Sequence, residues 1–422
     1  MRALVIGGGG REHALAWKIA QSPLVEALLA APGNPGIARH ATCMPVAADA
    51  LDGLVTLAKR ERIDLTVVGP EAPLVAGLAD RLTDAGLTVF GPGARAAAIE
   101  GSKAFAKDLM ARHGIPTARF ATFDAPARAR RYCREVGTPL VVKADGLAAG
   151  KGAIVCRTLD EADAAVAECM ELKAFGAAGT TVVVEEFLTG EEVSFFAFSN
   201  GHEALPLAAA EDHKPVFDGD QGPNTGGMGA HSPVGSFDTA MERRVMETIV
   251  RPAIAALAKE GAPYRGVLYV GLMLTADGPK VIEFNCRFGD PECQALMVRW
   301  PGDLVPQLLA AARGAAWPAL AAWPTHASVC VALASGGYPG KYRTGLPIDG
   351  IEAAAAKPGI QVFHAGTALR EGRLVTAGGR VLGVTALADD LSAAIQAAYD
   401  AVKEIRFEGM HYRTDIGRRR KP

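Results

Sequence analysis

Three polar side chains recur at alternate positions near residue 285, in a segment otherwise rich in apolar residues. Glu283 and Asn285 share one face of the predicted strand, and Arg287, two residues on, lies on the same side. A carboxylate and an amide oxygen are hard ligands that suit a Mg²⁺ ion bridging phosphates. Ile282 and Phe284 would cover the opposite, apolar face. The spacing therefore predicts a magnesium site beside an arginine that can neutralise a phosphoryl group or hold a carboxylate.

A glycine-rich turn with two lysines lies between Lys143 and Gly152. It departs from the Walker A motif, because Asp145 occupies the first glycine position and Gly152 replaces the final Ser or Thr. We expect a hairpin whose tip folds over phosphates, as glycine-rich loops do in kinases. Lys143 would reach inward from the strand end, and Lys151 would reach the distal phosphates. An exposed turn with a solvated lysine is the weaker interpretation.

An acidic segment, residues 185–192, follows the apolar strand predicted at 181–184. Backbone groups at such a strand end can pair with the edge of an adenine, while a carboxylate can accept hydrogen bonds from ribose hydroxyls. Because acidic turns are common on protein surfaces, this segment alone is a weak signal.

The chain begins with a short strand and a run of glycines, Gly7 to Gly10, before Arg11 and Glu12. Small residues let the backbone approach a phosphate, and the N-terminus of the following helix offers free N–H groups and the positive end of its dipole. The dinucleotide fingerprint GxGxxG fails, because Glu12 stands at its third glycine. The run thus predicts phosphate binding rather than NAD binding, with a tight strand-to-helix turn as the alternative.

A second glycine loop, residues 222–229, follows Asp212, His213 and Lys214. Exposed N–H groups in such a loop can cradle an acyl oxyanion. Asp212 could bind a small amine, whereas His213 alone is more often a structural hydrogen-bonding group than a base. No Ser-His-Asp or Cys-His grouping stands out. The predicted site therefore works by positioning and charge neutralisation rather than through a side-chain nucleophile.

The elements that must position these residues begin with a βα alternation over the first hundred residues. Apolar runs predict strands at 3–6, 28–30, 65–68 and 88–90, separated by helices at 12–21, 51–60 and 74–85. This pattern indicates a doubly wound parallel sheet. Ligands of such sheets bind beyond the carboxyl ends of the strands.

The pattern changes after Ser102, which we expect to cap a helix ending near His113. Further strands are predicted at 140–143, 153–155, 181–186, 193–198, 267–274 and 280–284, and helices at 160–172, 240–259 and 303–312. Residues 211–233 are expected to form a long functional loop. Residues 317–324 are expected to form a connector. Short strands and a helix at 391–405 then predict a small α+β domain.

Length and composition restrict the class of protein. A chain of 422 residues predicts two to four domains. With 44 Lys+Arg against 46 Asp+Glu, it has no global positive field to hold nucleic acid. Its seven scattered cysteines contain no CxxC pair, which argues against a disulfide framework or zinc finger and fits a reducing compartment. No apolar stretch suits a signal peptide or membrane span. We expect a cytoplasmic protein with neither nucleic acid nor membrane as partner.

Taken in order, these motifs resemble the phosphoribosylamine–glycine ligase family, also called glycinamide ribonucleotide synthetases, which are ATP-grasp enzymes of purine biosynthesis. The matching segments are 9–14, 31–34, 68–74, 100–105, 143–152, 185–192, 222–229, 283–292 and 336–340. Each is modest evidence, but their order along nearly the whole chain is highly specific. The resemblance implies a ligase that joins glycine to 5-phosphoribosylamine. Its products would be glycinamide ribonucleotide, ADP and phosphate, formed through a glycyl phosphate.

The resemblance also implies roles for individual residues. Those expected to contact ATP are Lys103, Lys143, Lys151, Glu185, Glu186, Phe187, Leu188 and Glu192. Glu283 and Asn285 would hold Mg²⁺ or Mn²⁺, and Arg287, Lys214 and Asp212 would act in catalysis. Substrate contacts are expected from Gly9, Gly10, Arg11, Asn34, Glu71, Asn224, Thr225, Gly226, Gly227, Met228, Gly289 and Asp290.

The implied architecture is a multidomain combination of α/β and α+β parts. Residues 1–101 would form the N-terminal substrate-binding domain, and 102–325 an ATP-grasp domain whose mobile lid covers about 121–187. Residues 326–422 would form the C-terminal domain. A monomer or weak homodimer is expected.

Three other functions are compatible with parts of this pattern. An ATP-grasp carboxylase acting on a purine intermediate or biotin would release ADP only with bicarbonate. A nicotinamide-dependent oxidoreductase would use the N-terminal sheet, but Glu12 argues against it. A nucleotide sensor without turnover would have little use for the charge-neutralising face formed by Glu283, Asn285 and Arg287.

Overall fold

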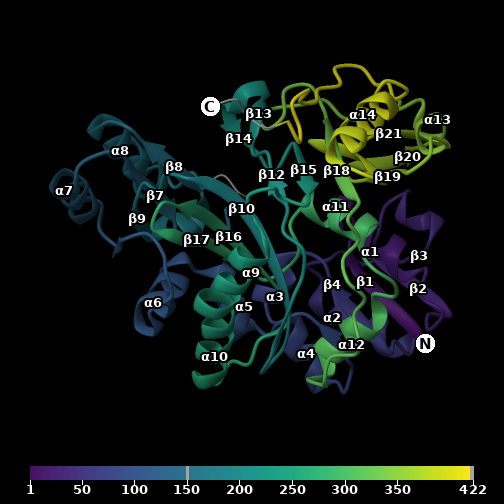
Figure 1. Ribbon diagram of the computed structural model, residues 1–422, viewed down its shortest axis with the longest axis horizontal. Helices are drawn as coiled ribbons and strands as arrows, with labels where there is room; N and C mark the ends of the chain where they lie inside the picture. Colours follow the sequence, from purple (N-terminus) through teal and green to yellow (C-terminus); the bar gives the residue numbers. More distant parts are fainter. Residues whose placement is uncertain (149–151, 419–422) are drawn as a thin grey trace.

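The computed structural model describes residues 1–148 and 152–418 of the chain. Four parts lie around a common centre (Figure 1). An antiparallel lid lies at the left, a larger antiparallel body at the centre, an N-terminal parallel sheet at the lower right and a C-terminal sheet at the upper right. The predicted combination of α/β and α+β parts is confirmed. None of the described helices is long and apolar enough to cross a membrane.

The N-terminal part is a five-stranded parallel sheet with strand order β3-β2-β1-β4-β5. Its strands are β1 (Arg2–Gly7), β2 (Ala27–Pro32), β3 (Thr42–Cys43), β4 (Leu65–Val68) and β5 (Val89–Phe90). Its helices are α1 (Gly10–Ile19), α2 (Leu51–Arg60), α3 (Glu71–Val75), α4 (Leu78–Asp84) and α5 (Ala94–Gly101). The chain runs outward from β1 on one side and then from β4 on the other. The switch point therefore lies between these two strands, where a crevice forms at their carboxyl ends.

The helix predicted over 74–85 is wrong as a single element. Gly77 has φ of +87°, in the left-handed region, and separates α3 from α4. Helix α3 begins at Glu71, so this acidic residue lies at a helix N-terminus beside the switch point.

The lid is a four-stranded antiparallel sheet in the order β6-β9-β7-β8. It contains β6 (Phe120–Phe123), β7 (Leu140–Ala144), β8 (Ala153–Cys156), β9 (Val182–Glu186), α7 (Pro126–Val136) and α8 (Leu159–Val166), which continues as a π-helical turn over Ala167–Glu171. Its own apolar core includes Cys133, Leu140, Val142, Val182 and Val184. A separate core lets this part pack independently of the body. Neither β6 nor α7 was predicted.

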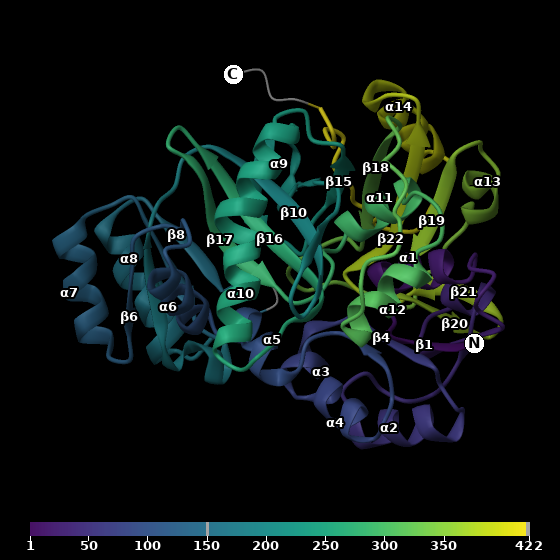
Figure 2. The same cartoon turned by 60° about the horizontal axis from the view of Figure 1, so that its bottom comes forward.

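The body sheet has the order β11-β10-β16-β17. Its strands are β10 (Glu191–Asn200), β11 (Ala204–Pro206), β16 (Arg265–Thr275) and β17 (Gly278–Asn285). Its helices are α6 (Lys103–His113), α9 (Thr239–Val245), α10 (Arg251–Lys259), α11 (Glu292–Arg299) and α12 (Val305–Arg313), with a π-helical turn between α9 and α10. Helices α9 and α10 cover one face of the sheet (Figure 2). Ser102 caps α6 as predicted, since its Oγ accepts from the N–H of Phe105 at 3.0 Å.

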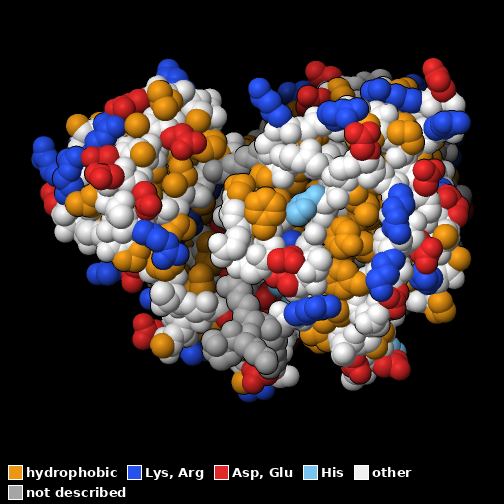
Figure 3. All heavy atoms as spheres, turned by 90° about the horizontal axis from the view of Figure 1, so that it is seen from above, with side chains coloured by type: hydrophobic (Ala, Val, Ile, Leu, Met, Phe, Trp, Pro, Cys, Tyr) orange, Lys and Arg blue, Asp and Glu red, His pale blue; other side chains and the backbone are white. Residues whose placement is uncertain are grey.

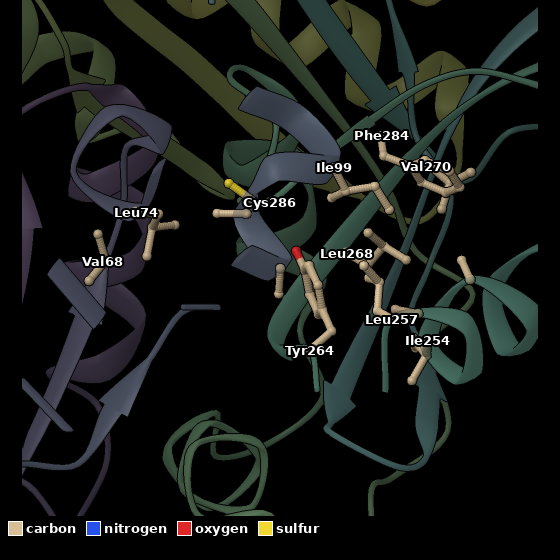
Figure 4. Close-up of a cluster of buried hydrophobic side chains, with 14 of the residues drawn as sticks. Val68, Leu74, Ile99, Ile254, Leu257, Tyr264, Leu268, Val270, Phe284 and Cys286 are labelled. Atoms are coloured by element: carbon tan, nitrogen blue, oxygen red, sulfur yellow. The ribbon is translucent and has the colours of Figure 1, made fainter. Parts of the chain in front are cut away.

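The apolar face of β17 anchors the centre of the molecule. Phe284 and Cys286 point into a buried cluster that also contains Leu257, Leu268 and Val270 (Figure 4). Because these two side chains are fixed in the core, the residues between and beside them are held toward the opposite side.

The C-terminal sheet has the order β12-β15-β18-β22-β19. Its strands are β12 (Glu211–Asp212), β15 (Gly229–Ser232), β18 (Ala327–Ala334), β19 (Ile360–His364) and β22 (Arg380–Ala388). This part also includes α13 (Ile351–Ala355), α14 (Leu391–Val402) and the hairpin of β20 (Thr367–Arg370) and β21 (Arg373–Thr376).

The prediction that residues 211–233 form one long loop is wrong. The segment contains β12, the hairpin of β13 (Pro215–Phe217) and β14 (Gln221–Asn224), and then β15. Strand β12 pairs with β15, and β15 pairs with β18 of the C-terminal part. These strands were missed because they are short and their partner lies about a hundred residues away in sequence. The middle of the chain thus contributes an edge of the C-terminal sheet.

Candidate active site

A cavity of about 930 Å³ lies where the four parts meet. Elements from each part contribute to it: the turn after β4, helix α6, strands β7 and β17, the connection between β9 and β10, and the start of β22. On the face seen in Figure 3, Lys and Arg side chains lie next to Asp and Glu side chains. This face therefore carries no patch of a single charge sign.

Strand β17 supplies a charged wall of the cavity. Glu283 and Asn285 line it, and Arg287 follows beyond the strand end. The predicted alternation is correct for these three residues but wrong for Ile282, which also lines the cavity. A bulge opposite Gly271 and Leu272 adds one residue to β17, so Ile282 is displaced from the apolar face.

Buried lysines surround the carboxylate of Glu185 at the lid side. Lys143 Nζ lies 2.9 Å from Glu185 Oε1, and Lys107 Nζ lies 2.7 Å from Oε2. Lys143 also donates to the carbonyl of Ile282 at 3.0 Å, which joins β7 of the lid to β17. The carboxylate of Glu185 is therefore engaged with cations of the protein itself. This residue, predicted to contact nucleotide, holds two lysines in place.

Burial changes the charge balance of these cations. It lowers the pKa of Lys107 to about 8, although Glu185 opposes the shift. Burial also lowers the pKa of Lys103, whose Nζ donates to the carbonyl of Gly146 at 3.0 Å. Bound anions would favour the charged form of both lysines.

The connection between β9 and β10 joins the lid sheet to the body sheet. Its residues Phe187 and Leu188 line the cavity, as do Glu186 before it and Glu192 after it. Apolar residues from several other elements also line the cavity: Ile99, Ala106, Met110, Val141, Val155 and Met273. Glu192, predicted to contact ribose, forms an ion pair with Lys214. An apolar surface beside a polar connection is suited to a flat, hydrogen-bonding ring.

Asp212 carries a carboxylate oxygen that no described residue contacts by a hydrogen bond. Its Oδ1 is buried without a hydrogen-bond partner among the described residues. Burial, followed by the nearby charge of Glu292, raises the pKa of Asp212 well above its usual range. Glu292 itself accepts from Ser194 Oγ at 3.0 Å, which lies 2.9 Å from the hydroxyl of Tyr269. A cation bound in the cavity beside these two carboxyl groups would therefore stabilise their ionised forms.

Glu283 experiences the opposite balance. Burial alone would raise its pKa, but Lys214, Lys143 and Lys103 outweigh burial and lower it. The carboxylate at the β17 wall is therefore ionised, which a metal ligand must be. Among the described residues there is no cluster of three or more His, Cys, Asp or Glu side chains that could enclose a metal. Glu283 and Asn285 fit instead a Mg²⁺ ion that takes its remaining ligands from phosphates and water.

Arg287 lies between two carboxylates from the N-terminal part. Its Nε is 3.2 Å from Glu71 Oε2, and its Nη2 is 3.1 Å from Glu100 Oε1. Burial would lower the pKa of Arg287, but Glu100 and Glu71 outweigh burial and raise it. Glu100 also accepts from the N–H of Cys286 at 2.7 Å. The guanidinium is therefore charged and fixed in direction.

The glycine run after β1 packs closely around Glu12. A Cβ on Gly7 would lie 2.5 Å from the Cγ of Glu12, and one on Gly69 would lie 2.3 Å from its Oε1. Glu12 accepts from Gly9 N–H and from Arg11 Nε, each at 2.6 Å. These glycines are thus required by a side chain of the protein that passes between β1 and β4.

Asp290 lies against the N-terminus of α1. It accepts from the backbone N–H of Arg11 and from Gln294 Nε2 at 2.7 Å. Burial would raise its pKa, but Arg380 and Arg11 outweigh burial and lower it. The positive end of α1 therefore faces a carboxylate of the chain itself.

Most of the predicted site residues meet at this one cavity. Those that line it are Arg11, Glu71, Lys103, Lys143, Glu185, Glu186, Phe187, Leu188, Glu192, Asp212, Lys214, Asn224, Thr225, Gly226, Glu283, Asn285, Arg287, Gly289 and Asp290. Residues Gly9, Gly10, Asn34, Gly227 and Met228 are not part of its lining. Lys151 lies outside the described residues.

Two of the residues outside the lining have evident structural contacts. Asn34 donates to the carbonyls of Gly8 and His364, each at 2.9 Å, and so links the N-terminal and C-terminal parts. Met228 is fully buried against Val216 and Ala334.

Sequence reasoning missed several residues of the cavity: Glu100, Lys107, Tyr269, Glu292 and Arg380. Tyr338, for which substrate contact and a purely structural turn were both left open, lines the cavity as well. Lys107 had a usable signal, because it lies four residues after Lys103 and so on the same face of α6. Arg380 had none. It begins a strand that lies far from the rest of the site in sequence.

Comparison with known proteins gives the family. Three family models match in succession: the phosphoribosylglycinamide synthetase N domain at residues 1–100, the ATP-grasp (A) domain at 101–293 and the C domain at 328–419. The chain belongs to the phosphoribosylglycinamide synthetase family. The predicted resemblance is therefore confirmed, and with it the class of enzyme: a phosphoribosylamine–glycine ligase of purine biosynthesis, built on an ATP-grasp domain.

Relatives match over almost their whole length. A phosphoribosylamine–glycine ligase from Agrobacterium fabrum is 54% identical over 417 residues, which is 99% of this chain and 98% of that protein. One from Pseudomonas aeruginosa is 53% identical over 422 residues, with the same two shares.

Solved structures agree. The phosphoribosylamine–glycine ligase of Thermotoga maritima has 33% identity and a TM-score of 0.86, covering 98% of this chain and all of that one. The biotin carboxylase domain of Hydrogenobacter thermophilus 2-oxoglutarate carboxylase has a TM-score of 0.74 at 18% identity, covering 97% of this chain and 91% of that one. That domain was solved with Mg-ADP and bicarbonate, and the likeness shows a shared fold.

Proposed function

We propose that this cavity joins glycine to 5-phosphoribosylamine through a glycyl phosphate, with ATP converted to ADP and phosphate. The observation that carries the proposal is the charge order inside the cavity. The carboxylate of Asp212, whose Oδ1 has no hydrogen-bond partner among the described residues, and the nearby Glu292 favour an ammonium group. Lys214, Lys103, Lys143 and Arg287 favour anions. Glycine is a zwitterion whose two ends match these two regions.

The nucleotide would occupy the side nearest the lid. Lys103 and Lys143 line this side. We keep the sequence-based assignment of Lys151, which lies outside the described residues, to the distal phosphates. The backbone of residues 186–188 would meet the adenine edge against the apolar patch. The ion pair of Glu192 with Lys214 leaves a second carboxylate oxygen for a ribose hydroxyl.

The metal would lie at β17. Glu283 and Asn285 supply one anionic and one neutral oxygen, which fits Mg²⁺, or Mn²⁺ in its place. When bound there, the ion neutralises charge that develops on the phosphoryl oxygens. The lysines and Arg287 act in the same sense from other directions.

The chemistry needs charge neutralisation at two steps. In the first, a glycine carboxylate oxygen bonds to the γ-phosphorus of ATP while the bond to the β,γ-bridging oxygen breaks, and ADP leaves. In the second, the amine of phosphoribosylamine attacks the acyl carbon, phosphate departs and the nitrogen loses a proton. We assign to Arg287 the task of offsetting the negative charge of both steps, and the ion pairs with Glu71 and Glu100 that fix its direction support this assignment.

The amine substrate would enter from the switch point of the N-terminal sheet. Arg11, Glu71, Gly289 and Asp290 line the cavity on that side. Glu71 lies at the N-terminus of α3, and Arg11 donates to the carbonyl of Phe288 at 3.1 Å. Crevices at this place in doubly wound sheets are the usual ligand sites.

The proposal extends to architecture and setting. We retain the division at residues 101 and 325, and a mobile lid over about 121–187, which the separate lid core supports. We also propose a cytoplasmic monomer or weak homodimer without nucleic-acid or membrane partners. All seven cysteines are free thiols, which supports a reducing compartment.

The test is ADP release from Mg-ATP with glycine and freshly made phosphoribosylamine, added separately and then together. Release that needs both substrates is the expected result. Release that needs bicarbonate instead would favour the carboxylase activity of the more distant fold relatives. Release with neither substrate would remove the assignment of both.

A further inference from the structure

The loop formed by residues 224–228, beside Asp212, is held by hydrogen bonds from the C-terminal sheet. Arg380, the first residue of β22, donates from Nη1 to the carbonyls of Gly226 at 2.6 Å, Gly227 at 3.2 Å and Asp290 at 2.5 Å. Its Nη2 lies 3.4 Å from the Asp290 carboxylate. One guanidinium thus engages both the loop and the segment after β17.

The base of Arg380 is fixed. Its Cα pairs with Ala334 of β18, and its carbonyl accepts from Gly366 N–H at 2.9 Å. The guanidinium lies beside Asp290, and this carboxylate outweighs desolvation in raising the pKa of Arg380. A charged fork on a rigid strand gives directional hydrogen bonds.

Tyr338 holds the same loop from a second position. Its hydroxyl accepts from the N–H of Gly226 at 3.1 Å. The Tyr338 ring lies against Gly379, where a Cβ would be only 2.3 Å from the ring. Gly226 is therefore held at both its N–H and its carbonyl by residues of the C-terminal part.

The loop in turn packs against Asp212, where we propose that the ammonium group binds, and against Lys214, which we assign to the anionic end. Gly227 has φ of +111°, and a Cβ there would lie 2.6 Å from Asp212 Oδ1. Thr225 donates to the carbonyl of Lys214 through both its N–H, at 2.9 Å, and its Oγ1, at 2.7 Å. A shift of the loop would therefore move Asp212 and Lys214.

We propose that Arg380 is a positioning residue, assisted by Tyr338, through which the C-terminal sheet sets the conformation of the 224–228 loop and the place of Asp212. The inference rests on the proposed glycine site. It gives the C-terminal domain a specific task in glycine binding, carried out through the loop and without a covalent step.

The main test is Arg380→Met, which keeps an apolar stem but removes the donors. Glycine saturation, ATP saturation and thermal unfolding are measured together. We expect kcat/KM for glycine to fall by about 100-fold, the cost of a misplacement near 1 Å, while KM for ATP stays within about twofold. Arg373→Met, at an exposed arginine of the β20-β21 hairpin, is the matched control and should behave as wild type.

A rescue experiment separates positioning from general destabilisation. Arg380→Ala leaves room for a free guanidinium ion, and low millimolar guanidinium should recover part of the lost kcat/KM for glycine. It should have no such effect on the wild type. Arg380→Met with unchanged glycine kinetics, or a loss confined to saturation by phosphoribosylamine, would overturn the proposal.

Tyr338→Phe decides the matter if both Arg380 variants fail to fold. It removes one hydroxyl and should raise KM for glycine about fivefold, the value of one neutral hydrogen bond, without changing the unfolding temperature. An unchanged KM for glycine would overturn the proposed positioning of the 224–228 loop. If ADP release by the wild type did not depend on glycine, the proposed function itself would be overturned, so the two failures are distinct.

Discussion

Arg287 shows how a single side chain becomes a fixed charge. Glu71 and Glu100, from two helices of the N-terminal part, lie 3.2 Å and 3.1 Å from its nitrogens. The guanidinium can therefore face developing negative charge without first reorganising, which is where most of the catalytic value of such groups lies.

We predict that Arg287→Ala lowers turnover by about 10²–10³, as expected for the loss of one preorganised transition-state donor. The measurement is kcat for ADP release at saturating substrates, with the unfolding temperature recorded to exclude misfolding. Exposed Arg313→Ala, at the end of α12, is the control. A near wild-type rate would remove Arg287 from the mechanism.

Glu283 gives a prediction about the metal. The surrounding lysines keep the Glu283 carboxyl group ionised, and Glu283→Gln removes this negative charge. The Mg²⁺ concentration for half-maximal rate should rise by about tenfold or more, the usual effect of losing part of a metal's ligand shell. Glu247→Gln on the exposed face beyond α9 should leave the titration unchanged. The assignment fails if both variants titrate like the wild type.

Among the helices and strands, α6 shows how an element is placed by its first residue. Ser102 accepts from Phe105 N–H and also donates to Asp145 Oδ1 at 3.0 Å. Asp145 in turn accepts from Ala104 N–H at 2.7 Å. The helix that carries Lys103 is thereby tied to the end of β7.

We expect Ser102→Ala to destabilise the protein by about 1 kcal/mol, the typical cost of a lost N-cap. The measurement is the shift in thermal unfolding. Thr56→Ala, which removes an exposed hydroxyl from the interior of α2, should change the free energy of unfolding by less than about 0.5 kcal/mol. Equal shifts in the two variants would contradict the capping argument.

Local signals explain which elements were predictable. Helix α2 and strand β4 have the predicted limits, because their apolar periodicity is clear. Helix α11 was missed because nearly all its residues are buried, so it lacks a polar face that would reveal its period. Helix α7 was missed for the opposite reason, since only Ala129 and Cys133 are buried and its apolar face is narrow.

The same distinction applies to the site. Glu283, Asn285 and Arg287 could be read from spacing along one strand, and Lys143 from a nearby turn. Arg380 and Tyr338 reach the cavity only because β15, β18 and β22 pair with one another. Pairing between strands far apart in the sequence leaves no local pattern in the sequence.

For the molecule as a whole, the junction between the N-terminal and C-terminal parts contains buried histidines. His13 of α1 accepts at Nδ1 from the N–H of His364 in β19 at 2.7 Å. Burial, followed by His364 and His40, lowers the pKa of His13 to about 2. The folded protein therefore binds fewer protons than the unfolded chain below about pH 6.5.

As pH falls below about 6.5, the unfolded chain takes up a proton at His13 and the folded state does not, so stability decreases by about 1.4 kcal/mol per pH unit from this group. His13→Asn keeps an acceptor for His364 and should flatten the fall of unfolding temperature between about pH 6 and pH 4. Exposed His202→Asn should retain the wild-type slope. Identical slopes for His13→Asn and wild type would contradict the prediction.

The mixed origin of the C-terminal sheet has a consequence for the order in which the protein matures on the ribosome. Strands β12 and β15 come from residues 211–232, but their partner β18 begins only at Ala327. Domains fold as they emerge, starting from the N-terminus. The segment with Asp212 and the glycine loop must therefore wait, already synthesised, for about a hundred more residues. Arg380 is synthesised later still, so the cavity is complete only when translation is nearly finished.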